Sequence, residues 1–179
     1  MSTKSKTLNL VHIAMFAVII AVCSWIAIPT TIPFTLQTFG IFVTIGMLGG
    51  KRGTAAVLVY ILLGIVGIPV FAEFTSGPGV ILLPSGGYLI GFIFTALVMW
   101  GMEKLSKKKW MLPLSMVIGL IVCYTFGTVW FMILYAKTAE AVSLWTALMW
   151  CVVPFILPDA IKIFLAVIIC NRFKKVIKL

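Results

Sequence analysis

The stretch Pro158-Asp159-Ala160-Ile161-Lys162 places two opposite charges inside the long apolar segment near the C-terminal end of the sequence. Residues three apart on a helix point to nearly the same face, so Asp159 and Lys162 are predicted to be neighbours. Charged side chains inside a hydrocarbon layer are costly and usually line a polar cavity or pathway. We therefore expect the functional site here. The alternative is that Asp159 caps the helix and pairs with Lys162 for structure alone.

The composition around this stretch is that of a membrane protein. The 179 residues are 63% hydrophobic and 10% charged, whereas soluble domains are about 45–50% apolar and about 25% charged. We expect an all-α integral membrane protein with a single transmembrane substrate-binding domain over residues 1–179. The net charge of +10 comes from short basic runs between apolar stretches. Such runs are typical of membrane topology beside a lipid bilayer, and no nucleic-acid partner is predicted.

Six apolar stretches are predicted to cross the membrane, because a helix needs about 20 residues to span a core of about 30 Å. A tight turn over Gly49–Gly53 separates the second stretch from the third. The last stretch is overlong and contains two prolines, so we expect it to be broken at its outer end. Irregular backbone is expected over Pro154–Leu157, with Asp159 in the first helical turn, about 10 Å beneath the outer boundary. The six stretches are residues 8–28, 35–50, 54–70, 86–103, 112–135 and 142–171.

Positive charge predicts the orientation, since cytoplasmic loops carry an excess of Lys and Arg. Twelve basic residues fall on one side of the six-helix arrangement, with both termini inside. The opposite connections carry only Lys137, beside Glu140 and Glu73. The twelve are Lys4, Lys6, Lys51, Arg52, Lys104, Lys107, Lys108, Lys109, Arg172, Lys174, Lys175 and Lys178.

Two outer connections are rich in polar and aromatic residues. They are 29–40 and 71–87, and the second contains the apolar run Val80-Ile81-Leu82-Leu83. Such connections can fold back over a cavity as lids. The alternative is that these residues only form the turns that connect the helices.

Enzyme signatures are missing from the sequence. Residues 46–52 (GMLGGKR) lack the spacing of a phosphate loop, and there is no HExxH, no GxSxG and no second intramembrane carboxylate. The four cysteines lie in apolar segments without CxxC spacing, so buried and inert thiols are expected. We predict no enzyme, no cofactor and no metal site.

The first apolar stretch carries small residues that suggest a partner surface. Ala17 and Ala21 have small-xxx-small spacing, and Ala14 lies on an adjoining position. Small faces let helices approach closely in lipid, so this face is a candidate docking surface. The alternative is ordinary packing within the chain.

Four strings together resemble BioY, the family of biotin-binding S components of energy-coupling factor (ECF) transporters. Each string is weak alone, but all four occur in the expected order over about residues 10–172. The strings are residues 32–40 (IPFTLQTFG), 62–72 (LLGIVGIPVFA), 84–92 (PSGGYLIGF) and 154–162 (PFILPDAIK).

This resemblance implies a six-helix protein of a prokaryotic plasma membrane with an external pocket capped by the first and third connecting loops. It further implies that biotin is captured and that a transmembrane coupling protein (T component) and two ATPase subunits are partners. The family's docking motif matches Ala17 and Ala21, and its Asp and Lys three apart match Asp159 and Lys162. An S component for another vitamin and a structural membrane subunit remain the alternatives.

Biotin suits such a pocket chemically, because its ureido ring offers two N–H donors and one carbonyl. Asp159 is expected to accept from the N–H groups, and Lys162 to donate to the carbonyl or to hold Asp159. Two departures from the family pattern are Glu73, in place of a small or neutral residue, and Ser85, in place of Thr. Further hydrogen bonds are expected from Thr35, Gln37, Ser85 and Tyr88, and apolar packing from Phe34, Phe39 and Trp150.

Overall fold

The computed structural model describes residues 3–30, 32–106, 108–138 and 142–176, and its regular structure is almost entirely helical. This confirms the all-α class. Lys107, Glu140 and Lys178 of the charge argument lie outside the described residues. The elements are α1 (Thr3–Trp25), β1 (Ala27–Ile28), β2 (Phe34–Thr35), α2 (Gln37–Leu48), α3 (Gly50–Val66), η1 (Ala72–Phe74), η2 (Pro78–Leu82), α4 (Gly86–Leu105), α5 (Met111–Thr138), α6 (Leu144–Cys151) and α7 (Val153–Val176).

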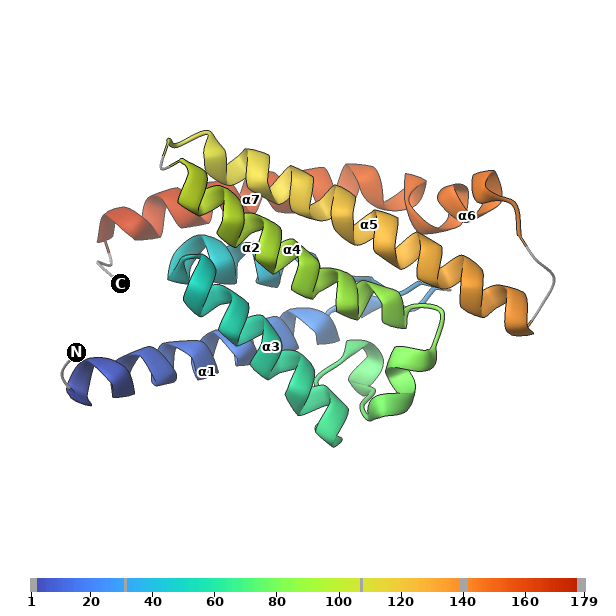
Figure 1. Ribbon diagram of the computed structural model, residues 1–179, viewed down its shortest axis with the longest axis horizontal. Helices are drawn as coiled ribbons and strands as arrows, with labels where there is room; N and C mark the ends of the chain where they lie inside the picture. Colours follow the sequence, from blue (N-terminus) through green and yellow to red (C-terminus); the bar gives the residue numbers. More distant parts are fainter. Residues whose placement is uncertain (1–2, 31, 107, 139–141, 177–179) are drawn as a thin grey trace.

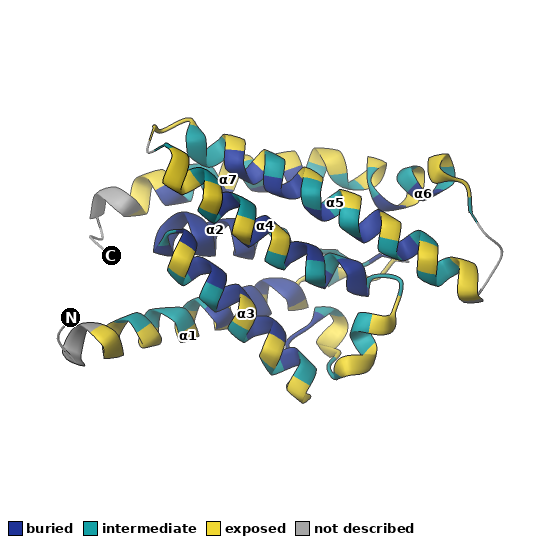
Figure 2. Ribbon diagram, viewed as in Figure 1, coloured by how far each residue is buried: buried dark blue, intermediate teal, exposed yellow. Residues whose placement is uncertain are grey.

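The helices form a bundle around α2, which packs against α1, α3, α4 and α7 (Figure 1). Ten of the twelve residues of α2 are buried, whereas α1, α5 and α7 each turn an exposed apolar face outward (Figure 2). Both chain termini lie at one end of the bundle, together with the α2–α3 junction and the α4–α5 connection. The β1–β2 hairpin, η1, η2, the C-terminal end of α5 and the N-terminal end of α6 lie at the other end.

Four described helical stretches are long and apolar enough to cross a membrane. α2 has 12 residues and α3 has 17, which gives them lengths of about 18 Å and 26 Å. Both are shorter than a hydrocarbon core of about 30 Å. Length alone therefore supports four of the six predicted spans in the part of the chain that the structure describes. The four stretches are Lys6–Trp25, Gly86–Leu105, Met111–Lys137 and Leu144–Phe173.

The predicted five-residue turn between the second and third spans is reduced to a single residue, Gly49. Its φ of 77° lies in the left-handed region that glycine enters without strain. α3 then begins at Gly50, four residues earlier than predicted. The Gly50 N–H donates to the Glu103 carboxylate of α4. A carboxylate at a helix N-terminus satisfies an unpaired N–H and favours the helix dipole, which accounts for the early start.

The last apolar segment is broken, but not where the prolines predict. The break is Val152, and α7 already begins at Val153, so the prediction of irregular backbone over Pro154–Leu157 is wrong. Proline is favoured in the first helical turn because an N–H there lacks a helical partner, so Pro154 begins this helix instead of interrupting it. Asp159 consequently lies in the second turn rather than the first, about 9 Å along the axis from the start of α7.

The small residues of α1 face the interior. Ala17 is 1% exposed and Ala21 is 4% exposed, and both belong to the main core cluster, whereas Ala14 is exposed. A Cβ at Gly40 of α2 would stand 3.3 Å from the Cα of Ile20, so α1 and α2 approach closely at this level. Ala17 and Ala21 are thus enclosed within the single chain, which agrees with the alternative of packing within the chain. Docking of a partner on this face of α1 stays a prediction.

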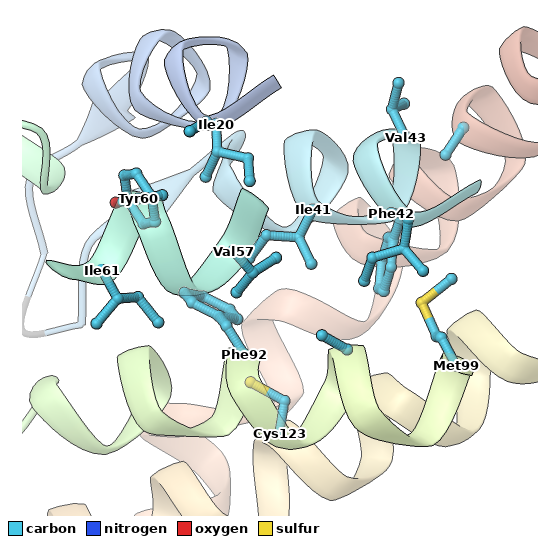
Figure 3. Packing of buried hydrophobic residues seen from close by; sticks show 14 of the residues in the cluster. Ile20, Ile41, Phe42, Val43, Val57, Tyr60, Ile61, Phe92, Met99 and Cys123 are labelled. Atoms are coloured by element: carbon cyan, nitrogen blue, oxygen red, sulfur yellow. The ribbon is translucent and has the colours of Figure 1, made fainter. Parts of the chain in front are cut away.

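The core fills the middle of the bundle with side chains from α1 to α5 and α7. The four cysteines are free and buried, as predicted. Because this packing is tight at the level drawn in Figure 3, open space remains chiefly towards the two ends of the bundle. Residues labelled there include Ile20 of α1, Ile41 and Phe42 of α2, Val57 and Tyr60 of α3, Phe92 and Met99 of α4, and Cys123 of α5.

Candidate functional site

The two charges of the opening stretch form a buried ion pair. Lys162 Nζ lies 2.7 Å from Asp159 Oδ1, with one helical turn of α7 between the residues. Asp159 is 2% exposed and Lys162 is 5% exposed. A charge at such depth is stable only when it is paired and hydrogen-bonded. The surrounding helices supply these additional bonds.

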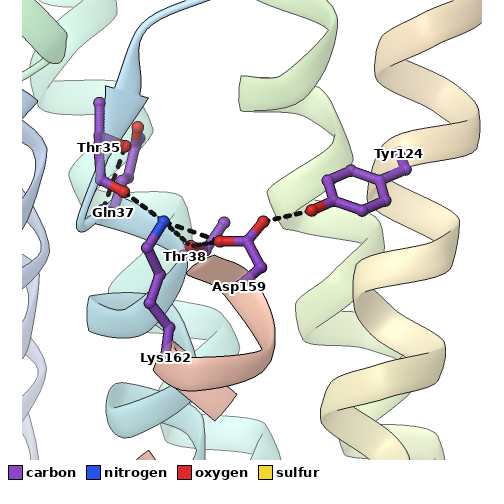
Figure 4. A network of polar contacts seen from close by, with 6 residues as sticks. All are labelled: Thr35, Gln37, Thr38, Tyr124, Asp159 and Lys162. Carbon is purple, nitrogen blue, oxygen red and sulfur yellow. Dashed lines mark hydrogen bonds and ion pairs between the residues drawn. The ribbon is translucent and has the colours of Figure 1, made fainter. Parts of the chain in front are cut away.

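Three elements converge on the Asp159 carboxylate (Figure 4). The Thr38 hydroxyl of α2 donates to Oδ1 at 3.0 Å, and the Tyr124 phenol of α5 donates to Oδ2 at 2.5 Å. Lys162, on the same helix as Asp159, completes the coordination of Oδ1. The carboxylate therefore connects α7 to both α2 and α5 through hydrogen bonds.

The hydrogens of Lys162 are used within the protein. Its ammonium donates to Asp159 Oδ1, to the Thr35 carbonyl at 2.6 Å and to Thr38 Oγ1 at 3.3 Å. An ammonium has three hydrogens, so these contacts account for all of them. Lys162 also lies 4.5 Å from the centre of the Phe34 ring, which stacks on Phe155. The lysine thus ties β2 to α7, and the arrangement leaves no lysine hydrogen for a ligand.

This network forms one wall of a cavity of about 260 Å³ near the hairpin end of the bundle. Ligand sites usually enclose about 300–1,000 Å³, so the cavity suits a small compound. Its wall is mostly apolar with a few polar groups, which is typical of such sites. The lining residues are Thr30, Ile32, Pro33, Thr35, Gln37, Thr38, Phe71, Ala72, Glu73, Thr75, Val80, Leu83, Ser85, Tyr88, Leu89, Phe92, Cys123, Tyr124, Cys151, Phe155, Asp159 and Lys162.

All six polar residues selected from the sequence for the binding site meet at this cavity. The Gln37 amide is buried and donates to the Tyr60 phenol at 2.7 Å, which leaves its second N–H hydrogen without an acceptor among the described residues. The Tyr88 phenol donates to the Cys151 carbonyl at 3.3 Å. The six that line the cavity are Thr35, Gln37, Ser85, Tyr88, Asp159 and Lys162.

The three aromatic residues selected from the sequence do not line the cavity. Phe34 touches the site indirectly, through Lys162 and Phe155. Phe39 packs against the main core, and Trp150 is 46% exposed with its ring edge against Tyr135. The apolar wall consists instead of Phe71, Phe92 and Phe155, among others. Phe39 lies on α2 and Trp150 on α6, so helix rotation decides which residues of these helices face the cavity.

Sequence reasoning missed two members of the polar network. Thr38 stands inside the string 32–40, where its hydroxyl was an available signal. Tyr124 is one of several polar-tipped residues in the largely apolar helix α5, and no local pattern distinguishes it. Only the packing of α5 beside α7 brings its phenol to Asp159.

The two outer connections lie over the cavity. Thr30, Ile32, Pro33 and Thr35 line it from the first connection, and Val80 and Leu83 of the apolar run are among the lining residues from the second. Glu73 and Phe74 both have φ near 57°, which is unfavourable for residues other than glycine. Phe74 stacks on Trp25 of α1 at 5.2 Å between ring centres. Glu73 is exposed at the cavity, so this loop brings an additional carboxylate to the rim.

The arrangement is built for binding. A carboxylate with fixed orientation lies beneath an apolar chamber, and hydroxyl and amide groups stand beside it. Among the described residues, no three His, Cys, Asp or Glu side chains gather as metal ligands would. The site is therefore suited to a small, largely apolar compound with N–H donors.

Comparison with known proteins identifies the family. A sequence model of the BioY family matches residues 1–179. The chain belongs to the BioY family. The biotin transporter BioY of Thermotoga maritima is 40% identical over 169 residues, which cover 93% of this chain and 96% of that protein. The probable biotin transporter BioY of Pyrococcus horikoshii is 36% identical over 173 residues, covering 96% and 98%.

A solved structure is similar to this BioY-family chain throughout its length. It is the S component for biotin from an ECF-type ABC transporter, with a TM-score of 0.86 and 29% sequence identity. The match covers 98% of this chain and 95% of that one. The resemblance to the BioY family that the four strings indicated is confirmed. The bundle described above is thus an S-component fold in a membrane protein.

Proposed function

We propose that this BioY-family chain is the biotin-binding S component of an ECF-type transporter and acts in biotin uptake. The observation that carries the proposal is the buried Asp159–Lys162 pair in the wall of a cavity of about 260 Å³. The named relatives are biotin transporters, and the similar structure is an S component for biotin. Because the family consists of transport components, the prediction that the chain is not an enzyme is confirmed.

Biotin fits the chemistry of this wall. The ureido N–H groups require an acceptor, which the Asp159 carboxylate provides, and the ureido carbonyl requires a donor. Gln37 is suited to be that donor, because its second amide hydrogen has no acceptor among the described residues and Lys162 has no free hydrogen. The bicyclic ring and the valeryl chain would pack on Phe92, Phe155 and Leu89.

The chain would act as one six-span domain in a prokaryotic plasma membrane, with both termini inside. The basic residues near the α2–α3 junction, in the α4–α5 connection and near the C-terminus support this orientation, because these segments share one end of the bundle. The cavity lies towards the opposite end and would then load from outside. A T component and two ATPase subunits are the expected partners, since the chain has no nucleotide-binding motif of its own.

Calorimetric titration of the detergent-purified protein tests the ligand. We expect saturable binding of one biotin per chain and no binding of riboflavin or thiamine. Binding of another vitamin in place of biotin would identify an S component of different specificity. The absence of binding to every vitamin would favour the structural-subunit alternative.

Asp159→Asn tests the site itself. We expect biotin affinity to fall more than tenfold, about 1.4 kcal/mol or more, because the charged acceptor is lost. Glu103→Gln makes the same chemical change on the exposed end of α4, at the other end of the bundle, and should leave affinity unchanged. Undiminished affinity in folded Asp159→Asn protein would contradict the role of Asp159.

A further inference from the structure

The two oxygens of the Asp159 carboxylate are not equally engaged. Oδ1 accepts from both Lys162 and Thr38, whereas Oδ2 accepts from Tyr124 alone. A carboxylate oxygen has two lone pairs. The described contacts therefore saturate Oδ1 and leave one acceptor position on Oδ2. The oxygen available to a ligand is the one that Tyr124 holds.

Tyr124 lies at the cavity itself. It is half-buried on α5, and both Tyr124 and Asp159 are lining residues. Its ring reaches the carboxylate from the side opposite to Lys162 and Thr38 (Figure 4). A ligand N–H that approaches Oδ2 from the cavity therefore shares this oxygen with the phenol.

The orientation of the carboxylate depends on this second anchor. The terminal torsion of an aspartate side chain is soft, so contacts to Oδ1 alone leave Oδ2 free to swing. A charge-assisted hydrogen bond to Oδ2 from another helix fixes the plane of the group. The remaining lone pair of Oδ2 is then directed before a ligand arrives, which lowers the cost of ordering on binding.

We propose that Tyr124 is a positioning residue for biotin recognition, which holds Asp159 Oδ2 so that its free lone pair accepts a ureido N–H. The inference rests on the proposed function and extends it to a residue outside the four family strings. Tyr124 acts through Asp159, and its phenol O–H continues to donate a hydrogen bond to the carboxylate when the ligand is bound. Lys162 and Thr38 complete the support from the other side.

Tyr124→Phe tests the proposal, because it removes the phenol oxygen and keeps the ring. Biotin affinity, measured by calorimetry, should fall about tenfold, the effect of one lost charge-assisted bond. Tyr135→Phe makes the same change on the same helix at a residue that does not itself line the cavity, and should alter affinity less than about twofold. An unchanged affinity in Tyr124→Phe protein would overturn the proposal.

A double-mutant cycle separates positioning from a merely structural role. If Tyr124 acts through Asp159, Tyr124→Phe should weaken binding strongly in the native background and less than about twofold in the Asp159→Asn background. Equal losses in both backgrounds would show that Tyr124 acts independently of Asp159, against the proposal. A failure of the native protein to bind biotin would instead refute the proposed function.

Ligand analogues provide the same separation if Asp159→Asn binds too weakly to measure. Desthiobiotin keeps the ureido N–H groups and lacks the sulfur ring, so it should lose affinity for Tyr124→Phe as biotin does. Biotin methylated on the ureido nitrogen that contacts Asp159 should bind the native and Tyr124→Phe proteins alike. Equal weakening for every analogue, with a lowered melting temperature of the free protein, would indicate a structural role and overturn the inference.

Discussion

At the scale of single residues, the site is organised around a buried carboxylate that requires a partner of opposite charge. Asp159 and Lys162 are each less than a tenth exposed, and their neutralising contact is 2.7 Å long. Breaking a buried ion pair by removing one partner costs about 3–5 kcal/mol, because the other charge remains without compensation. Removing both charges is far less costly.

This asymmetry gives a prediction for Lys162. Lys162→Met should lower the free energy of unfolding by about 3–5 kcal/mol, because Asp159 is left unpaired. The double variant Lys162→Met/Asp159→Asn should recover much of that loss while its biotin binding stays weak. Thermal unfolding in detergent, paired with titration, measures both quantities. A double variant less stable than Lys162→Met alone would contradict this account of the pair.

At the scale of elements, the small residues Ala17 and Ala21 lie where helices pack within the chain. Both belong to the main core cluster on α1, which contacts α2 and α3. Docking of a partner at these residues stays a prediction. In α7, the two prolines were expected to unwind the start of the helix. Pro154 stands in the first turn, where it favours a helix, so the break falls before it at Val152.

Matched substitutions on α1 test the position of its small residues. Ala17→Leu adds three carbons to a core position that is 1% exposed and should cost about 1–3 kcal/mol through overpacking. Ala14→Leu adds the same group to an exposed position and should change the melting temperature little. Equal melting temperatures for the two variants would contradict the burial of Ala17 in the core and favour the docking hypothesis.

At the scale of the whole molecule, charge and cavity lie towards opposite ends. The described basic segments lie at the end where α1 begins and α7 ends. The two outer connections and the cavity lie towards the other end. Since basic loops remain in the cytoplasm, this polarity predicts that the cavity is accessible from outside. The four native cysteines are buried and free, which makes the orientation measurable with introduced thiols.

Single exposed positions at the two ends test this orientation. Thr75→Cys lies in the outer connection 71–87 and should react with a membrane-impermeant maleimide on intact cells. Lys108→Cys lies in the α4–α5 connection and should react only after the membrane is permeabilised. The native protein, with its buried thiols, provides the unlabelled background. The reversed labelling pattern would place the cavity on the cytoplasmic side.

Features that depend on local spacing could be predicted from the sequence. The hydrophobic excess and the basic runs are one-dimensional properties, so they identified the membrane class and a consistent charge map. The i, i+3 spacing of Asp159 and Lys162 is fixed by helix geometry, so their contact followed directly. The four strings indicated the family because their order along the chain is itself a sequence property.

Only the tertiary structure decided which faces meet. Tyr124 and Asp159 are separated by 35 residues, and their bond exists because α5 packs beside α7. Ala17 is interior, and Phe39 and Trp150 lie away from the cavity, because helix rotation selects which side of a string is enclosed. Sequence therefore determined the membrane class, the family and the charged pair, since these depend on composition and local period. The cavity, its lids and the second anchor of Asp159 depend on contacts between distant segments, which the local pattern does not encode.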